Sequence, residues 1–302
     1  MVTLCLYRRF QPTCTGVSMR LLFFVLFAGS LNLFSVVYVE AKRTLLWKPI
    51  QKGIRYTRVR IPGAKNTKDP YLHVVRVEPN QVDFHIHRAH LSTKRLLTAK
   101  QWAKRLGVPV VVNMGMYQRD LRSHVGYLRR GKKVYQRRWR KTYLSVFAFG
   151  PRKKGIPAAT ILDLDQKGTK QKLKLYHTVI QNLRLIKASK GRGVGVWSQK
   201  KRRHWSEAAL GLDKKGRLLI LFSHVMMNMW RWNRFVLSLP LGVLRAMHLD
   251  GGPPASVTIS TSSFQYHGHG GGAGIFSRYP RFRQVPIPNV IGISAKRTKG
   301  SL

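Results

Sequence analysis

The sequence predicts an α+β fold, a single domain with a mixed, mostly antiparallel sheet and a few flanking helices. Short segments that alternate apolar and polar residues, or that are apolar throughout, recur along most of the chain. Turns rich in Gly, Pro, Asn and Asp separate these segments, as expected between strands. Few segments have helical spacing, and we find no internal repeat.

The expected elements follow one another along the chain. Residues 54–61 (IRYTRVRI) alternate apolar and polar side chains, as a half-buried strand does. Residues 98–106 have helical spacing, and Gly107 ends this helix. A second helix is expected over residues 233–239, ending at Pro240. Further strands are expected over residues 72–77, 82–87, 108–112, 144–149, 160–164, 206–212, 217–222, 244–249, 257–259 and 290–293, with a hairpin over 124–135 that turns at Gly131.

The chain is strongly basic but has the composition of a folded protein. It has 302 residues, with 56 Lys and Arg against 10 Asp and Glu, and a formal net charge of +46 at pH 7. Hydrophobic residues make up 44% and charged residues 22%, which is the usage of globular domains. So few acids exclude sites that need many carboxylates, such as an array of EF-hands. The charge favours an anionic partner.

The N-terminus has the pattern of a secretory signal peptide over residues 1–41. Residues 21–39 are uncharged and mostly apolar, and they lead to a small-residue cleavage site with Val39 and Ala41. This pattern predicts a periplasmic or secreted protein. Because the apolar run is long, an uncleaved membrane anchor is the alternative. The sequence has no second long apolar run, so we do not expect a protein with several membrane spans.

Cleavage after Ala41 would leave residues 42–302 as one domain. It would remove Glu40 and both cysteines, Cys5 and Cys14, so the mature chain would contain nine acids and no thiol. Cysteine nucleophiles, disulfides and Cys-ligated zinc would then be excluded. No cofactor is expected, and the sequence leaves a structural divalent metal open.

Two apolar strands are each expected to end in a polar residue followed by glycine. In VVVNMGMY, Asn113 is followed by Gly115, and in MHLDGG, Asp250 is followed by Gly251 and Gly252. A polar side chain at the end of a core strand is held rigidly while its tip faces a cleft, and glycine lets a ligand approach the main chain closely. The alternative is an Asx turn that closes each strand.

The few acids give a short list of further candidates. Alternation along a strand places His248 and Asp250 on one face, where they would form an acid–base pair, and a solvent-exposed His248 is the alternative. Asp120 follows the first motif at loop distance. Glu207 begins a strand, and a local Lys or Arg is its alternative partner.

Two other polar segments are expected to lie outside the site. Asp163 and Asp165 alternate with leucines before a turn, which predicts an exposed strand end. His267 and His269 lie in a glycine-rich segment, HGHGGGAG. A phosphate or metal site would need a surrounding pattern that is missing here, so we expect a mobile loop or lid.

These motifs, in this order, resemble the phosphodiester glycosidase family. The similar features are the segment 113–117, Gly126 in the hairpin that follows, the segment 205–213, and the block 249–256. The segments QNLRL (181–185) and IPNVIG (287–292) resemble a bacterial-type branch. The resemblance spans roughly residues 47–294, nearly all of the mature chain.

The resemblance implies hydrolysis of a sugar 1-phosphodiester at the glycosidic C1–O bond. Asp250 would be the acid, base or stabilising carboxylate, and Asn113 would orient sugar hydroxyls or a water. Glycoside hydrolysis normally uses two carboxyl groups, and Asp120 or Glu207 is the candidate for the second. The expected substrate-binding residues are Gly115, Gly126, Gly251, Gly252, His248 and Ser256.

Three functions are compatible with the sequence. The first is an exported hydrolase that acts on a sugar 1-phosphodiester in an anionic envelope glycan or glycolipid. The second is a non-catalytic protein that binds anionic envelope polymers on the same fold. The third, a nucleic-acid-binding protein, is disfavoured because the signal peptide predicts export and no zinc-finger, basic-zipper or RNA-recognition motif is present. The expected partners are therefore a phosphorylated carbohydrate and the anionic cell envelope.

Overall fold

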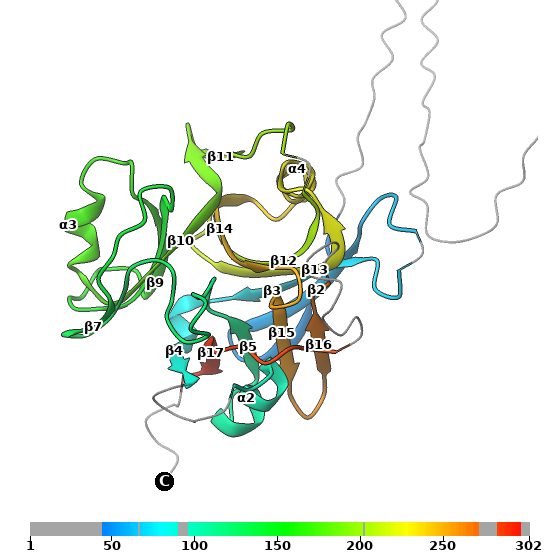
Figure 1. The fold of residues 1–302 in the computed structure, drawn as a ribbon, viewed down its shortest axis with the longest axis horizontal. Helices are drawn as coiled ribbons and strands as arrows, with labels where there is room; N and C mark the ends of the chain where they lie inside the picture. Colours follow the sequence, from blue (N-terminus) through cyan, green and yellow to red (C-terminus); the bar gives the residue numbers. More distant parts are fainter. Residues whose placement is uncertain (1–43, 66, 90–95, 202, 272–282, 297–302) are drawn as a thin grey trace, which may run out of the picture. The chain divides into compact units, whose positions relative to one another are not determined.

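A computed structural model describes residues 44–65, 67–89, 96–201, 203–271 and 283–296 (Figure 1). The predicted signal peptide, residues 1–41, lies outside the described residues, as does part of the glycine-rich segment, 272–274. Residues Leu45–Leu302 group into one unit by their contacts. Its strands and few helices confirm the α+β class.

The described strands form two sheets, and every strand pair in them is antiparallel. In the larger sheet, β14 lies between β12 and β10, and β13 lies between β12 and β3. Its twelve strands among the described residues are β1 (Lys48–Gln51), β2 (Ile54–Arg60), β3 (Tyr71–Val77), β6 (Leu128–Arg130), β7 (Lys133–Gln136), β8 (Ser145–Pro151), β9 (Ala159–Asp163), β10 (Tyr176–Ser189), β11 (Arg192–Gly195), β12 (Trp205–Asp213), β13 (Leu218–Met227) and β14 (Val243–Gly251).

The smaller sheet has five strands within the described ranges, in the order β16-β15-β5-β17-β4. These are β4 (Val82–Arg88), β5 (Val110–Asn113), β15 (Ser256–Ser260), β16 (Gln265–His269) and β17 (Asn289–Ala295). The chain passes from the larger sheet to the smaller one between β14 and β15, directly after Asp250. Both predicted motifs therefore lie at strand ends, one in each sheet.

A shared hydrophobic core lies between the two sheets. Val110 and Val112 of β5 and Ile291 of β17 pack in one cluster with Leu210 of β12 and Met247 of β14, and all five are almost fully buried. Alternation along β5 turns the side chains of Val110 and Val112 to the same face, so this strand is fixed against the larger sheet.

The helices cover the other faces of the two sheets (Figure 1). On α2 (Ala99–Leu106), Trp102 packs with Val111 of the smaller sheet. On α4 (Met229–Ser238), Trp232 packs with Leu221 of the larger sheet. The other helical segments that lie wholly within the described residues are short, α3 (Thr169–Leu173) and the 3₁₀ turn η1 (Pro79–Gln81). No helix within the described ranges is long and apolar enough to span a membrane.

The sequence pattern misses β10, which is the longest described strand at 14 residues. Its interior carries Gln181, Asn182 and Arg184, which interrupt the apolar pattern that identifies a buried strand. All three side chains are nevertheless buried. This strand lies beside β14 and positions several loops near the candidate site.

The glycine-rich segment is partly a strand, which corrects the prediction of a mobile loop for its first residues. His267 and His269 belong to β16 and pair with Thr258 and Ser256 of β15. The ring nitrogen His224 Nδ1 lies 2.8 Å from the carbonyl oxygen of His269 and holds the end of this strand. Glycine is depleted in strands, so the sequence alone does not indicate this pairing.

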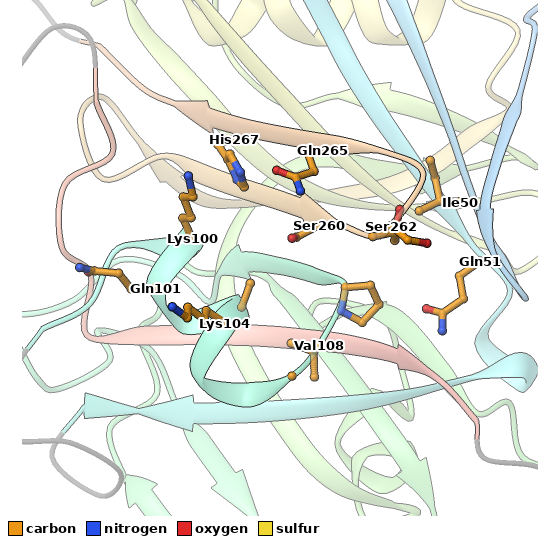
Figure 2. Close-up of a pocket in the computed structure, with 14 residues that line it drawn as sticks. Ile50, Gln51, Lys100, Gln101, Lys104, Val108, Ser260, Ser262, Gln265 and His267 are labelled. Atoms are coloured by element: carbon orange, nitrogen blue, oxygen red, sulfur yellow. The ribbon is translucent and has the colours of Figure 1, made fainter.

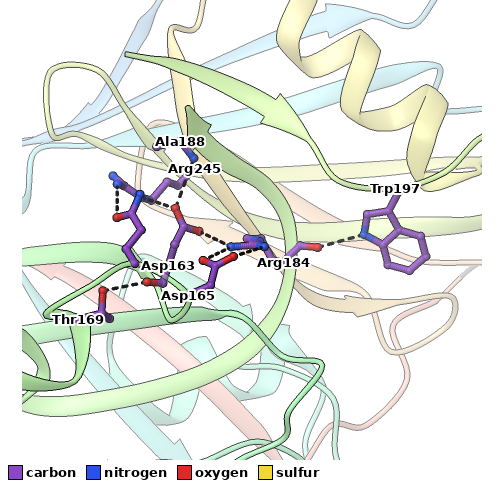
Figure 3. Close-up of polar contacts among 8 residues, drawn as sticks. Asp163, Asp165, Thr169, Arg184, Ala188, Trp197 and Arg245 are labelled. Carbon is purple, nitrogen blue, oxygen red and sulfur yellow. Dashed lines mark hydrogen bonds and ion pairs between the residues drawn. The ribbon is translucent and has the colours of Figure 1, made fainter. Parts of the chain in front are cut away.

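The prediction of an exposed strand end at Asp163 is wrong, because this residue is 1% exposed and lies in an ion network (Figure 3). Asp163 Oδ2 accepts from Arg245 Nε at 2.9 Å, and its Oδ1 lies 3.4 Å from Arg184 Nη1. Arg184 also binds both oxygens of Asp165, at 2.7 and 2.9 Å. The network joins β9 to β10 and β14, and its two acids are balanced by two arginines.

Candidate active site

Glu207 of β12 and His248 of β14 form a buried hydrogen-bonded pair. Their strands are neighbours, and Glu207 Oε1 lies 2.6 Å from His248 Nδ1. The indole Nε1 of Trp205 donates to Glu207 Oε2 at 2.9 Å, so both carboxylate oxygens have partners. Glu207 is thus bound by a histidine and a tryptophan rather than by a Lys or Arg. His248 is 4% exposed, which excludes the alternative of a surface histidine.

Burial and pairing set the protonation of these two groups. Burial disfavours the charged imidazole, but the Glu207 carboxylate outweighs this effect and raises the pKa of His248. Burial also raises the pKa of Glu207, although His248 opposes that shift. His248 donates its Nδ1–H to Glu207, which leaves Nε2 as the ring nitrogen that can bind a ligand. Nε2 has no hydrogen-bond partner among the described residues.

Asp250 lies two residues beyond His248, across a β-bulge. His248 pairs with Ala209 while Asp250 pairs with Ala208, so strict alternation does not hold between the two side chains. The Asp250 carboxylate is almost buried and accepts the N–H of Gly251 at 2.8 Å. Burial raises the pKa of Asp250 to about 7, against the opposing effects of the His248 charge and the Gly251 N–H. A carboxyl with this pKa exchanges a proton near neutral pH.

Asn113 at the end of β5 holds the chain that leads away from Asp250. Its Oδ1 accepts the N–H of Ser256 at 3.1 Å, and its Nδ2 is buried with no partner among the described groups. The Ser256 hydroxyl donates to the carbonyl oxygen of Pro254 at 3.1 Å. Asn113 and Ser256 are therefore brought together, and Asn113 keeps one unused pair of donor hydrogens.

The predicted glycines are sites of close packing between protein groups. Gly115 has φ +154°, and a Cβ there would collide with the Asn182 side chain. A Cβ at Gly251 would collide with the indole of Trp205, which binds Glu207. A Cβ at Gly126 would collide with the carbonyl oxygen of Gln181. The N–H of Gly252 donates to the carbonyl oxygen of Ser206 at 2.9 Å. That these glycines give a ligand access to the main chain stays a prediction.

Two buried side-chain amides on β10, neither of them a predicted site residue, position the loops around this region. Asn182 Nδ2 donates to the carbonyl oxygen of Met114 at 3.0 Å and so holds the loop after Asn113. Gln181 Nε2 donates to the carbonyl oxygens of Arg140 and Tyr143, at 2.8 and 2.7 Å, on the segment after β7. Asn182 is next to Leu183, which pairs with His248. The sequence feature that could have identified these two residues is a Gln-Asn pair inside an otherwise mostly apolar run.

The segment after β7 contacts the loop after Asn113. The Tyr143 hydroxyl lies 3.8 Å from Met116 Sδ on that loop. Burial raises the pKa of Tyr143, and the Asp250 carboxylate adds to this shift. The loops after β5 and β7 thus meet at Met116 and Tyr143.

Asp120, the other candidate for a second carboxyl group, lies at the surface. Its Oδ1 accepts the N–H groups of Arg122 and Ser123, each at 2.9 Å, and its Oδ2 accepts the Ser123 hydroxyl at 2.5 Å. These hydrogen bonds lower the pKa of Asp120, so it stays ionised. Asp120 closes a turn, and no contact joins it to Glu207 or Asp250 among the described residues.

A groove of about 730 Å³ lies between α2 and the β15–β16 hairpin (Figure 2). Lys100, Lys104 and His267 line it, together with Pro109 just before β5. Asn113 is at the opposite end of β5, so the groove is separate from the predicted site residues, none of which lines it. Within the described ranges, no group of three or more His, Cys, Asp or Glu side chains has an arrangement that could hold a metal ion.

Two solved structures have folds similar to that of this chain. One is the catalytic domain of zebrafish N-acetylglucosamine-1-phosphodiester alpha-N-acetylglucosaminidase, auto-inhibited by its pro-peptide, with a TM-score of 0.53 and 14% identity over 82% of this chain and 85% of that one. The other is a hypothetical protein from Synechocystis, with a TM-score of 0.52 and 12% identity over 86% of this chain and 65% of that one. At these identities the likeness concerns the fold alone.

The sequence gives a family match as well. No curated protein matches the chain. The model of the phosphodiester glycosidase family matches residues 106–294, which is more than half of the chain and includes β5, β10, β12 and β14. The motifs at Asn113 and Asp250 both lie inside the matched range. The chain belongs to the phosphodiester glycosidase family.

Proposed function

We propose that this protein hydrolyses the glycosidic C1–O bond of a sugar 1-phosphodiester and releases a sugar and a phosphomonoester. Membership of the family supports this reaction class. The observation that carries the proposal is the Asp250 carboxyl, which is buried beside the Glu207–His248 pair and has a pKa of about 7. General acids and bases work best when their pKa lies near the working pH.

In the proposed reaction, protonated Asp250 donates its proton to the oxygen that bridges C1 and phosphorus. The C1–O bond breaks, its electron pair goes to the phosphate oxygen, and the oxygen of a water molecule adds to C1. The proton that this water loses restores the acid form of Asp250. Sugar and phosphomonoester are then the only products.

Glu207 is proposed as a positioning residue for His248 rather than as the second reacting carboxyl, because both of its oxygens are already bound. A carboxylate that accepts the Nδ1–H of an imidazole fixes its tautomer and stabilises its charged form. His248 Nε2 would then face the anionic phosphate of the substrate as a charged donor. The unused Nδ2 of Asn113 would donate to a sugar hydroxyl. No cofactor takes part in this scheme.

We further propose that the substrate is an anionic envelope glycan or glycolipid and that the protein is exported. The signal peptide pattern of residues 1–41 and the net charge of +46 support this setting. N-terminal sequencing of the protein from the cell envelope tests the export step. A mature chain that begins near residue 42 is expected, and a chain that keeps its apolar segment would instead indicate an anchor.

The reaction is tested by incubating the protein with a synthetic sugar 1-phosphodiester and measuring released reducing sugar. Asp250→Asn is expected to lower the rate by about 10²-fold or more, as the removal of a general acid does. The matched control is Asp120→Asn, which removes a surface carboxylate that only closes a turn and is expected to leave the rate near wild type.

Hydrolysis that survives Asp250→Asn undiminished would remove the proposed role of this residue. Tight binding of the phosphodiester by the wild-type protein without any release of sugar would favour the non-catalytic binding protein instead.

A further inference from the structure

An aromatic pair joins the segment between β7 and β8, which carries the exposed Trp139, to the partly buried Tyr127 just before β6. Trp139 is 42% exposed, and its ring lies flat on Tyr127, with ring centroids 4.1 Å apart and planes inclined by 8°. We call these two side chains the aromatic platform. Large aromatic side chains usually bury most of their surface, so a tryptophan that is ordered but exposed to solvent suggests a binding surface.

The buried side chain of Gln181 fixes the backbone that carries the platform. Its Nε2 donates to the carbonyl oxygens of Arg140 and Tyr143, at 2.8 and 2.7 Å. Its Oε1 accepts the N–H groups of Tyr127 and Arg140, each at 3.0 Å. One buried amide therefore fixes the backbone that follows Trp139 and the backbone of its stacking partner. A surface ordered in advance loses little entropy when a ligand binds.

Cationic side chains surround the platform, and its segment leads to the candidate active site. Arg137, Arg138 and Lys141 are exposed, and the segment 137–143 contains no acid. Its last residue, Tyr143, contacts the loop after Asn113, where its hydroxyl lies 3.8 Å from Met116 Sδ. A ligand that extends from the candidate active site along this segment would meet positive charge and then a flat aromatic surface.

We infer that the aromatic platform is a subsite for a second sugar unit, and that the substrate is a polymer of sugars joined by phosphodiesters. The inference rests on the proposed function. The apolar face of a sugar ring would stack on Trp139, and the guanidinium groups of Arg137 and Arg138 would bind the adjacent phosphates. The platform thus extends the site from one phosphodiester to a chain of them.

Binding is measured first, in an Asp250→Asn background, with a sugar-phosphate oligomer of at least four units. Adding Trp139→Ala is expected to weaken binding about tenfold, the effect of losing one stacking contact of about 1.4 kcal/mol. Trp139→Phe is expected to restore most of the affinity because it keeps a flat ring. The matched control is Trp230→Ala on α4, a partly buried tryptophan stacked with Arg234, which is expected to leave binding unchanged.

Hydrolysis is then compared between the oligomer and a single-unit phosphodiester, without the Asp250 change. Trp139→Ala is expected to lower the ratio of their kcat/KM values about tenfold. If the single unit is hydrolysed but oligomer binding and this ratio are the same with and without Trp139, the platform inference is overturned while the proposed function stands.

If the oligomer binds in a Trp139-dependent manner but no substrate is hydrolysed, the platform stands and the proposed reaction fails. Single-stranded DNA is the competing ligand, because bases also stack on aromatic rings. A loss of DNA binding in Trp139→Ala with oligomer binding unchanged would overturn the inference.

Discussion

Two clusters of carboxylates lie in the larger sheet, and they differ in the partners of their acids. In the first, Asp163 is bound by Arg184 and Arg245 (Figure 3). In the second, Glu207 and Asp250 are near His248, and Glu207 binds no Arg or Lys in the described part of the chain. We call them the arginine cluster and the histidine cluster.

The partner decides what each cluster can do. A guanidinium is always charged at working pH, so an acid bound to it stays ionised, and the pKa of Asp165 is lowered by its hydrogen bonds to Arg184. An imidazole gains and loses a proton near neutral pH, and burial raises the pKa of Asp250 to about 7. The arginine cluster therefore fixes structure, and the histidine cluster can move protons.

At a fixed pH, the largest expected loss of stability comes from breaking the arginine cluster. Arg184→Ala leaves the buried Asp163 with one cation fewer, which is expected to lower the free energy of unfolding by about 3 kcal/mol. Urea unfolding followed by circular dichroism measures this change. Arg192→Ala on β11 is the matched control, because its side chain is exposed, and it is expected to change stability by less than about 0.5 kcal/mol. Equal stability of the two variants would contradict a structural role for the cluster.

The next effect is a pH dependence of stability that belongs to Asp250. Its pKa is about 7 in the folded protein and about 3.8 when unfolded, so between these values the folded state holds a proton that the unfolded state has released. The free energy of unfolding therefore falls as pH rises through this window, by up to roughly 4 kcal/mol from this group. The contribution is complete below pH 4 and lost above pH 7.

Urea unfolding of the wild type and Asp250→Asn at pH 4.5, 6 and 7.5 measures this linkage. The stability of the variant relative to the wild type is expected to increase with pH, because an amide does not titrate. A constant difference between the two proteins across this range would show that Asp250 has no raised pKa.

The smallest expected effect comes from changing the partner inside the histidine cluster. Glu207→Gln keeps the shape but removes the charge that raises the pKa of His248. The acidic form of His248 should then be lost at lower pH, and kcat should fall about tenfold to a hundredfold with KM changed much less. The pH profile of kcat for a sugar 1-phosphodiester measures both. A change in KM alone, with the profile unmoved, would argue against a positioning role.

The sequence predicted best those elements whose ends are fixed by residues close by in the chain. The helix α2 begins with a reciprocal capping pair, Thr98 and Gln101, and ends at Gly107 in a left-handed conformation, so its bounds could be predicted closely. The Asp213 turn is similar, since its carboxylate accepts the N–H groups of Lys215 and Arg217. Such elements need only neighbouring residues.

The site depended on contacts that local patterns do not contain. Glu207 and His248 are 41 residues apart and meet only because β12 pairs with β14. Asp163 resembled an exposed residue because its two arginines come from other strands. The strand ends at Asn113 and Asp250 could be predicted from the sequence. The bulge between His248 and Asp250 and the role of β10 could not, because both depend on how the strands pair.

Asp250 is expected to exchange a proton near neutral pH, and a carboxyl titration tests this without a substrate. Residues 42–302 contain seven Asp, few enough for each ¹³C carboxyl resonance to be assigned by single Asp→Asn variants. We predict one resonance with a midpoint near pH 7 that is absent in Asp250→Asn. Midpoints below about pH 5 for all seven would show that Asp250 has no raised pKa.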